Sequence, residues 1–248
     1  LSFAFSQEDN NNVFWTNIIQ IKLDKRADFE KKLPAFLKTH YPGFSFRIYE
    51  IITGPNTGSY AVVTGPLSYK DLDQPMTSPK GEAARMADEQ ALDAISVKAE
   101  VSHLRRVNDL SMAKTDRKLK FLQVTYREFQ NGSWGDTRDI LKKLKDARIA
   151  GGSKFDVDIY RPVASGPLNM YASVRYFEKW EELDYDEKLT DLYDKVNGTG
   201  SWYREVDKLN EWTKNSRSEL RVLRPDLSVT KQYYKKRLPM KRAAFINQ

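Results

Sequence analysis

The sequence predicts an α+β fold made of two tandem copies of one folding unit. Segment 44–49 returns as 155–160, and segment 60–63 returns as 171–174, both at an offset of 111 residues. Ile19 aligns with Leu122 at an offset of 103, and Ser102 aligns with Ser218 at an offset of 116. Offsets that rise along the chain indicate duplication with insertions, because chance similarities would scatter.

Each element of the first copy has its own signal. Apolar side chains at odd positions predict a half-buried strand over 13–23. Apolar residues at helical spacing predict a helix over 26–39, which Pro42-Gly43 ends. Alternation predicts a strand over 44–49, and a turn over 54–58 leads to a returning strand from Tyr60. An alanine-rich face predicts a long helix over 82–102, and a short strand over 104–107 closes the unit.

The second copy repeats this order. We expect strands over 119–129, 155–160, 170–174 and 220–223, and a helix over 134–148 that Gly151-Gly152 ends. One or two helical turns are expected within 177–193, and a further helix follows Ser201, which is a good N-cap residue. Strand, helix, strand, strand, helix, strand is the order of a ferredoxin-like unit, in which two helices cover one face of an antiparallel sheet.

The length of 248 residues is enough for two such units, each with a core of its own. We place a leader at 1–12, the first unit at 13–112, the second at 113–228 and a basic tail at 229–248. No apolar run approaches the roughly 20 residues of a transmembrane helix. Because the chain has no cysteine, disulfides and thiolate chemistry are excluded.

The two ends of the chain carry further expectations. Residues 1–6 are apolar and finish in Ala4-x-Ser6 before a polar stretch, which is typical of the end of a bacterial secretory signal. We therefore expect export to the periplasm or outside the cell, with a cytoplasmic location as the alternative. The net charge of +7 lies mostly in the last 18 residues. This tail is a candidate contact for anionic surfaces, although most charged termini are simply solvated, and no specific nucleic-acid site is indicated.

Two ferredoxin-like units can bury their bare sheet faces against each other, which closes a barrel with helices outside. In this the chain resembles the dimeric α+β barrel superfamily, which includes antibiotic-biosynthesis monooxygenases, EthD-like proteins, chlorite dismutases and the NIPSNAP-like family. The resemblance covers most of residues 13–228 and rests on element order and duplication. It implies a ligand pocket either between sheet and helices within a unit or inside the barrel.

Alternation then sorts the strand residues into two faces. The helix-facing set is Ile19, Ile21, Phe44, Phe46, Ile48, Leu122, Val124, Phe155, Val157 and Ile159. The barrel-facing set, which supplies the candidate ligand-binding residues, is Gln20, Arg47, Tyr49, Gln123, Asp156, Asp158 and Tyr160. Polar groups buried in a barrel need partners. The alternative to ligand binding is that Arg47 pairs with Asp156 or Asp158 and holds the halves in register.

Catalytic motifs are absent from the sequence. There is no nucleophile elbow, P-loop, dinucleotide fingerprint or metal-ligand spacing. No cofactor is evident, but haem is a possible one, because several members of the resembled superfamily bind haem through a helix histidine. His103, at the end of the expected 82–102 helix, is the candidate ligand, with Glu219 as its repeat equivalent.

Three functions stay open at this point. The first is small-molecule binding in a cavity of the barrel. The second is a monooxygenase-like enzyme acting on an aromatic or haem-like substrate, which needs only an apolar pocket with a few polar groups. The third is a structural or interaction protein without a ligand, in which buried polar residues only set the register of the halves.

Overall fold

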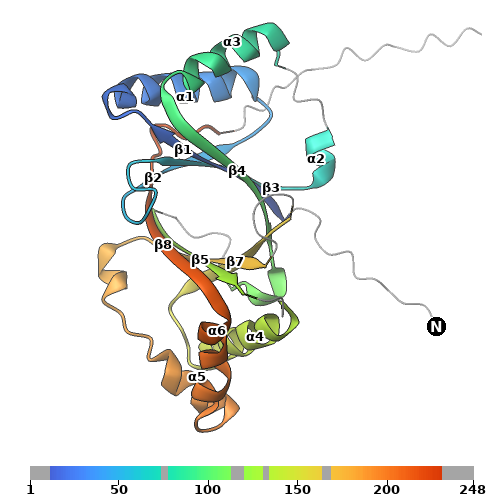
Figure 1. Cartoon of the computed structure of the whole chain (residues 1–248), viewed down its shortest axis with the longest axis vertical. Coiled ribbons are helices and arrows are strands. Elements are labelled where there is room, and N and C mark those ends of the chain that lie inside the picture. The colour runs from blue at the N-terminus through green and yellow to red at the C-terminus, as the bar shows by residue number, and fades with distance from the viewer. Residues whose placement is uncertain (1–11, 74–77, 113–119, 131–133, 164–168, 231–248) are drawn as a thin grey trace, which may run out of the picture.

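The computed structural model describes residues 12–73, 78–112, 120–130, 134–163, 169–230 (Figure 1). The expected leader, apart from Asn12, and the tail from residue 231 onward lie outside the described residues. No helix in the described part combines the length and apolarity that a membrane crossing requires.

Eight antiparallel strands form a closed barrel in the order β1-β3-β2-β8-β5-β7-β6-β4. The strands of the first unit are β1 (Val13–Ile21), β2 (Phe46–Ile51), β3 (Tyr60–Leu67) and β4 (Ser96–Arg106). Those of the second unit are β5 (Phe121–Phe129), β6 (Asp156–Pro162), β7 (Met170–Phe177) and β8 (Thr213–Leu223). Each unit therefore contributes one four-stranded sheet, as the duplication predicts.

The helices lie outside the barrel, at opposite ends of the molecule (Figure 1). In the first unit α1 (Arg26–His40) packs against α3 (Glu82–Asp93), and the short α2 (Tyr69–Asp73) lies apart from them. The second unit has α4 (Trp134–Ala150), α5 (Leu189–Asn197) and α6 (Asp207–Trp212), the last preceded by a π-helical turn over Trp202–Val206. Short 3-10 turns cover Leu23–Lys25, Asn108–Leu110 and Trp180–Leu183.

The two sheets join at two equivalent seams. At one seam β4 pairs with β6 over Leu104–Arg106, and at the other β8 pairs with β2 over Arg221–Leu223. Each seam has three residue pairs, far fewer than the central pairs of each sheet. The two sheets are therefore held together mainly by the packing of side chains from both units in the barrel interior.

The expected long helix over 82–102 is wrong in its second half. Helix α3 ends at Asp93, and β4 begins at Ser96. Val97, Ala99 and Val101 alternate with charged residues, and this period of two fits the full-length pairing of β4 with β1. Strand β8 likewise begins at Thr213, seven residues before the expected start at 220.

Strand register corrects the alignment of the two copies at both ends. In β1, Ile19 pairs with Tyr60, and in β5, Arg127 pairs with Tyr171, the repeat equivalent of Tyr60. Ile19 therefore corresponds to Arg127 at an offset of 108, rather than to Leu122. Strands β4 and β8 correspond at an offset of 117, so the equivalent of His103 is Leu220 and that of Ser102 is Glu219.

Three cores result. Phe14, Ile18, Tyr49, Leu122, Val124, Tyr126, Tyr160 and Tyr176 are among the residues that fill the barrel. The first-unit core packs α1 and α3 onto Ile19, Ile21, Phe46 and Ile48, and the second-unit core packs α4 and α6 onto Val157 and Ile159. The assignment of Leu122 and Val124 to the helix side is therefore wrong, because it depended on the odd offset of 103.

Candidate functional site

The barrel interior holds a hydrogen-bonded polar network on its β6 side. Tyr160 and Tyr176 share a hydrogen bond of 2.8 Å between their hydroxyls, and Tyr176 also donates to Asp158 Oδ2 at 3.1 Å. Arg106 Nη2 donates to Asp158 Oδ1 at 2.8 Å across the β4–β6 seam. Burial raises the pKa of Tyr160 and of Tyr176, so both hydroxyls stay protonated.

A second network lies around β8. Glu219 and Arg221 form a fully buried ion pair at 2.7 Å, and Arg221 Nη2 also donates to the Tyr126 hydroxyl at 2.9 Å. Asn56, in the turn between β2 and β3, donates to Glu219 Oε1 at 2.6 Å. Together the two networks tie the units to each other.

The expected barrel-facing residues divide into three groups. Arg47, Tyr49, Asp156, Asp158 and Tyr160 lie on the barrel side of β2 and β6. Gln20 is exposed near the end of β1. Gln123 lies on the face of β5 opposite to Leu122 and Val124, which fill the barrel, so the barrel-facing assignment of Gln123 is wrong.

The expected partner of Arg47 also differs. Arg47 Nη2 donates to the carbonyl of Gly65 at 3.3 Å and its guanidinium lies 6.0 Å from the Phe14 ring centre, whereas Arg106 forms the short ion pair with Asp158. The barrel centre retains about 50 Å³ of free space. That volume suits one or two water molecules rather than an organic ligand.

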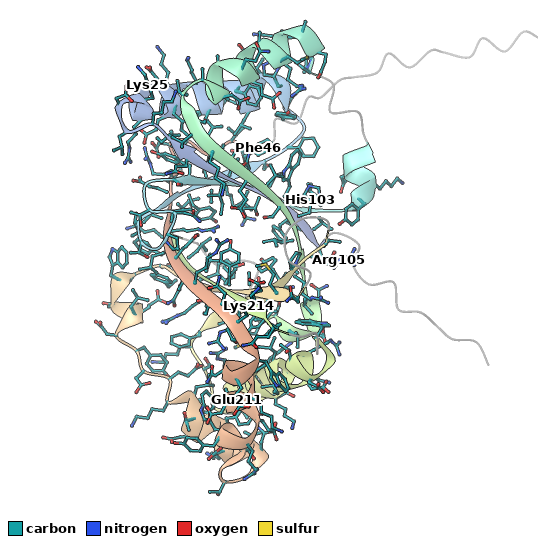
Figure 2. All side chains as sticks on the ribbon, in the orientation of Figure 1. Lys25, Phe46, His103, Arg105, Glu211 and Lys214 are labelled. Carbon is teal, nitrogen blue, oxygen red and sulfur yellow. The ribbon has the colours of Figure 1, made fainter. Side chains whose placement is uncertain are left out.

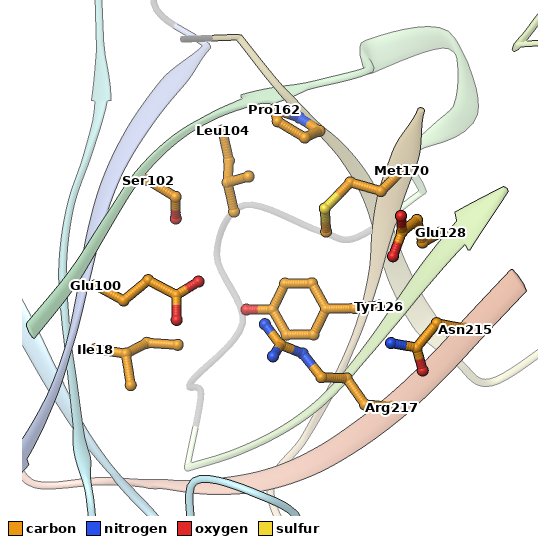
Figure 3. Close-up of a pocket in the computed structure, with 10 residues that line it drawn as sticks. All are labelled: Ile18, Glu100, Ser102, Leu104, Tyr126, Glu128, Pro162, Met170, Asn215 and Arg217. Carbon is orange, nitrogen blue, oxygen red and sulfur yellow. The ribbon is translucent and has the colours of Figure 1, made fainter. Parts of the chain in front are cut away.

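One mouth of the barrel opens into a cavity of about 260 Å³, which Figure 3 shows. Side chains of β4, β5 and β8 point into it, among them Glu100, Tyr126 and Arg217 (Figure 3). Glu100 and Arg217 are repeat equivalents, so duplication placed opposite charges around this mouth. The guanidinium of Arg217 lies 4.8 Å from the Tyr126 ring centre, and the Glu100 side chain is 49% exposed beside Lys98. The Glu100 charge is therefore solvated, whereas Arg217 is partly buried against Tyr126.

A more apolar cavity of about 310 Å³ lies within the first unit; we call it the first-unit pocket. The sheet forms its floor, and α1 and α3 form its roof. Its apolar lining comprises Ile19, Phe29, Leu33, Phe36, Leu37, Tyr41, Phe44, Phe46, Val62, Leu92, Ala99 and Val101. Arg85 stands at the α3 side and is bound by Glu82 and by Glu89 at 2.6 Å, so its charge is neutralised locally.

Two polar side chains rise from the floor of the first-unit pocket. Trp15 and Asn17 lie two residues apart on the central strand β1, flanked by β3 on one side and β4 on the other. The indole Nε1 of Trp15 and the amide Oδ1 of Asn17 are buried and have no hydrogen-bond partner among the described residues. Buried polar atoms in folded proteins are rarely left unpaired, and each one costs about 1–3 kcal/mol.

Sequence reasoning missed this pair, although one signal for it was present. Odd positions of β1 carry apolar residues except at position 17, so Asn17 interrupts the buried stripe. A polar amide in the middle of a central strand, facing the helices, is unusual enough to mark a cavity.

The placement expected for the haem-ligand candidate His103 is wrong. His103 (Figure 2) lies in strand β4 rather than at a helix end, with its ring 5.7 Å from that of Trp15. It is not among the residues that line the barrel mouth, the barrel centre or the first-unit pocket. His40 is buried and bonded through Nδ1 to Ser78 at 2.6 Å and through Nε2 to Asp88 at 2.9 Å. The described residues contain no cluster of three or more metal-binding side chains.

The second unit has a corresponding cavity of about 330 Å³ between its sheet and α4, here called the second-unit pocket. Its floor carries Thr125 and Arg127 where the first-unit pocket has Asn17 and Ile19. The two copies thus keep the position of a pocket and differ in its chemistry.

No family model and no curated protein match the sequence. Solved structures do match the fold. An anthrone oxidase-like protein superposes with a TM-score of 0.58 at 9% identity, covering 87% of this chain and 92% of that one. A candidate monooxygenase from Lactobacillus acidophilus gives 0.51 at 11% identity, covering 89% and 97%. A mutant chlorite dismutase from Candidatus Nitrospira defluvii gives 0.53 at 10%, covering 87% and 92%.

Proposed function

From the premise that the chain has the dimeric α+β barrel fold, with both units in one polypeptide, we propose that it binds a flat, largely apolar small molecule in the first-unit pocket. The observation that carries this proposal is the unpaired state of Trp15 Nε1 and Asn17 Oδ1. A ligand hydroxyl can accept a hydrogen bond from the indole N–H and donate one to the amide oxygen. One hydroxyl-bearing ring system therefore satisfies both groups.

The size and lining of the first-unit pocket support an aromatic ligand. A cavity of about 310 Å³ is at the small end of ligand sites, which run from roughly 300 to 1,000 Å³. Phe29, Phe36, Tyr41, Phe44 and Phe46 supply ring edges and faces around it. Aromatic pairs gain about 0.5–1.5 kcal/mol beyond area burial, which favours a ring over an alkyl chain of equal size.

The test uses 2-naphthol as the probe, with calorimetric titration of wild type, Trp15→Phe and Asn17→Leu. Trp15→Phe keeps the ring but removes the donor, and we expect affinity to fall about 3- to 10-fold, the value of one neutral hydrogen bond. Trp180→Phe, on a tryptophan that is 49% exposed and outside the pocket, is the matched control and should bind like wild type.

Equal affinity in wild type, Trp15→Phe and Asn17→Leu would overturn the proposal. So would the absence of any binding heat or thermal stabilisation, since a ligand that binds the folded state must raise its stability. That second outcome is the one expected of a structural protein without a ligand.

Oxygenation of the bound molecule is a second candidate function. It is favoured by the similarity of the fold to a candidate monooxygenase and to an anthrone oxidase-like protein. The matching assay incubates the protein with anthrone in air and follows its conversion with O₂ to anthraquinone and water. Turnover that Trp15→Phe or Asn17→Leu lowers supports an enzyme; binding without turnover supports a binding protein.

A further inference from the structure

The residues that line the second-unit pocket have a net positive charge, which those of the first-unit pocket do not. The cations of the second-unit pocket are Arg127 from β5 and Lys145 and Arg148 from α4, and its lining contains no aspartate or glutamate. In the first-unit pocket, by contrast, the single cation Arg85 shares the lining with Glu89 and Asp93. Duplication therefore left two pockets of similar volume and opposite electrostatic character.

Two of the three cations are already engaged. Arg148 Nε donates to Glu187 Oε2 at 2.8 Å, and that carboxylate is buried. Lys145 Nζ donates to the backbone carbonyl of Asp109 at 2.9 Å, on the outside of the unit. Arg148 therefore has an acidic partner, and Lys145 has a backbone acceptor.

Arg127 is different. In the described part of the chain no carboxylate lies within ion-pair distance of its guanidinium, and the buried Tyr171 lines the same pocket. It occupies the place that Ile19 holds in the first unit, on the helix-facing side of a central strand. Arg127 is partly buried, so its guanidinium loses part of its hydration without gaining a carboxylate partner among the described residues.

Besides its three cations, the second-unit pocket is lined by the polar Thr125, Ser173 and Asn210 and by a larger set of apolar residues. Its walls are formed by Leu110, Met112, Leu141, Leu144, Val157, Ile159, Leu189, Trp202, Val206 and Leu209. A molecule that fits must combine one anionic group with a hydrophobic body. A planar carboxylate matches the guanidinium fork better than a single-point anion does, because both of its oxygens can accept hydrogen bonds.

We propose that the second-unit pocket binds an amphipathic monocarboxylic acid, with its carboxylate on Arg127 and its apolar body between α4 and the sheet. This site is separate from the first-unit pocket and does not depend on the function proposed there. A cavity of about 330 Å³ admits a two-ring aromatic acid or a medium-chain fatty acid.

The experiment titrates the whole protein with 2-naphthoate and with its neutral analogue 2-naphthamide and follows the heat of binding. Trp202, which lines this pocket, also contributes to the intrinsic tryptophan fluorescence that serves as a second readout. Wild type should prefer naphthoate at least 10-fold. Arg127→Met should weaken naphthoate about 10- to 100-fold, the value of a charge-assisted hydrogen bond, and abolish the preference. Arg127→Lys should keep part of the preference for naphthoate over naphthamide.

Two controls make the result specific. Lys142→Met removes a charge from the exposed face of α4 and should bind naphthoate like wild type. Trp15→Phe alters only the first-unit pocket and should also leave naphthoate binding unchanged. Because Arg127→Met removes a cation that has no acidic partner among the described residues, the variant should unfold at the same or a higher temperature than wild type.

Equal binding of naphthoate and naphthamide by wild type would overturn the proposal, as would naphthoate binding that is unchanged in Arg127→Met. Loss of naphthoate binding in Trp15→Phe together with normal binding in Arg127→Met would move the acid to the first-unit pocket and equally refute this site.

Discussion

Arg106 of the first unit donates a 2.8 Å hydrogen bond to Asp158 of the second, at the end of the seam where β4 meets β6. The carboxylate also accepts from Tyr176, so one buried group gathers donors from both copies. Arg106→Met should lower the free energy of unfolding by about 2–3 kcal/mol, because it leaves a buried carboxylate with fewer donors. Urea unfolding at neutral pH measures this. A loss below about 0.5 kcal/mol would show that the seam does not need the pair.

The Glu219–Arg221 ion pair predicts a non-additive effect. Arg221→Met alone should cost about 3–5 kcal/mol, since it leaves Glu219 uncompensated at zero exposure. The double variant Glu219→Gln/Arg221→Met, with neutral groups of similar size, should lose less than Arg221→Met alone. A double-mutant cycle by denaturant unfolding tests this, and strict additivity would contradict the buried pair.

Glu30 predicts a specific acid dependence of stability. Hydrogen bonds from Arg224, Tyr60 and Arg26 lower the pKa of this carboxyl to about 2, with Arg224 the largest cause. A depressed pKa stabilises the folded state above the unfolded value of about 4.3, and that stability is lost as the pH falls towards 2. Glu30→Gln should therefore cost about 2–3 kcal/mol at pH 7 and almost nothing at pH 2. A difference independent of pH would contradict the assignment.

Two glycines of the β2–β3 turn form a matched pair. Gly54 and Gly58 both have positive φ, 88° and 84°, so alanine at either position should cost about 1 kcal/mol. A Cβ at Gly54 would also stand 2.5 Å from the carbonyl oxygen of Ser218, whereas a Cβ at Gly58 meets nothing within 4 Å. Gly54→Ala should therefore be the more destabilising by about 1–3 kcal/mol. Thermal unfolding of both variants checks this; equal losses would refute the close contact between the turn and β8.

The duplication and the closed barrel were predictable from sequence because they depend on element order and on the β2–β3 repeat, whose offset of 111 the register of Tyr49 and Tyr160 confirms. Register in β1 and β5 was not predictable. Their apolar residues occur on both faces, one towards the helices and one towards the barrel, so alternation alone could not fix which face Leu122 takes.

The candidate sites were even harder to predict from the sequence. Trp15 looks like an ordinary core residue in sequence, and only its position on a cavity floor reveals an unpaired donor. Arg127 could be recognised as a candidate only after strand register showed that it is the repeat equivalent of Ile19 in the first unit. Barrel-facing Asp158 and Tyr160 were located correctly, but their partners Arg106 and Tyr176 depend on seam geometry that alignment does not contain.

The most direct test of the central claim is a crystal structure of the protein soaked with 2-naphthol. We expect density for the ring system between α1 and β1, with the naphthol oxygen within hydrogen-bond distance of Trp15 Nε1 and Asn17 Oδ1. Density only at the barrel mouth or in the second-unit pocket, or a first-unit pocket that stays empty at saturating ligand, would contradict the account.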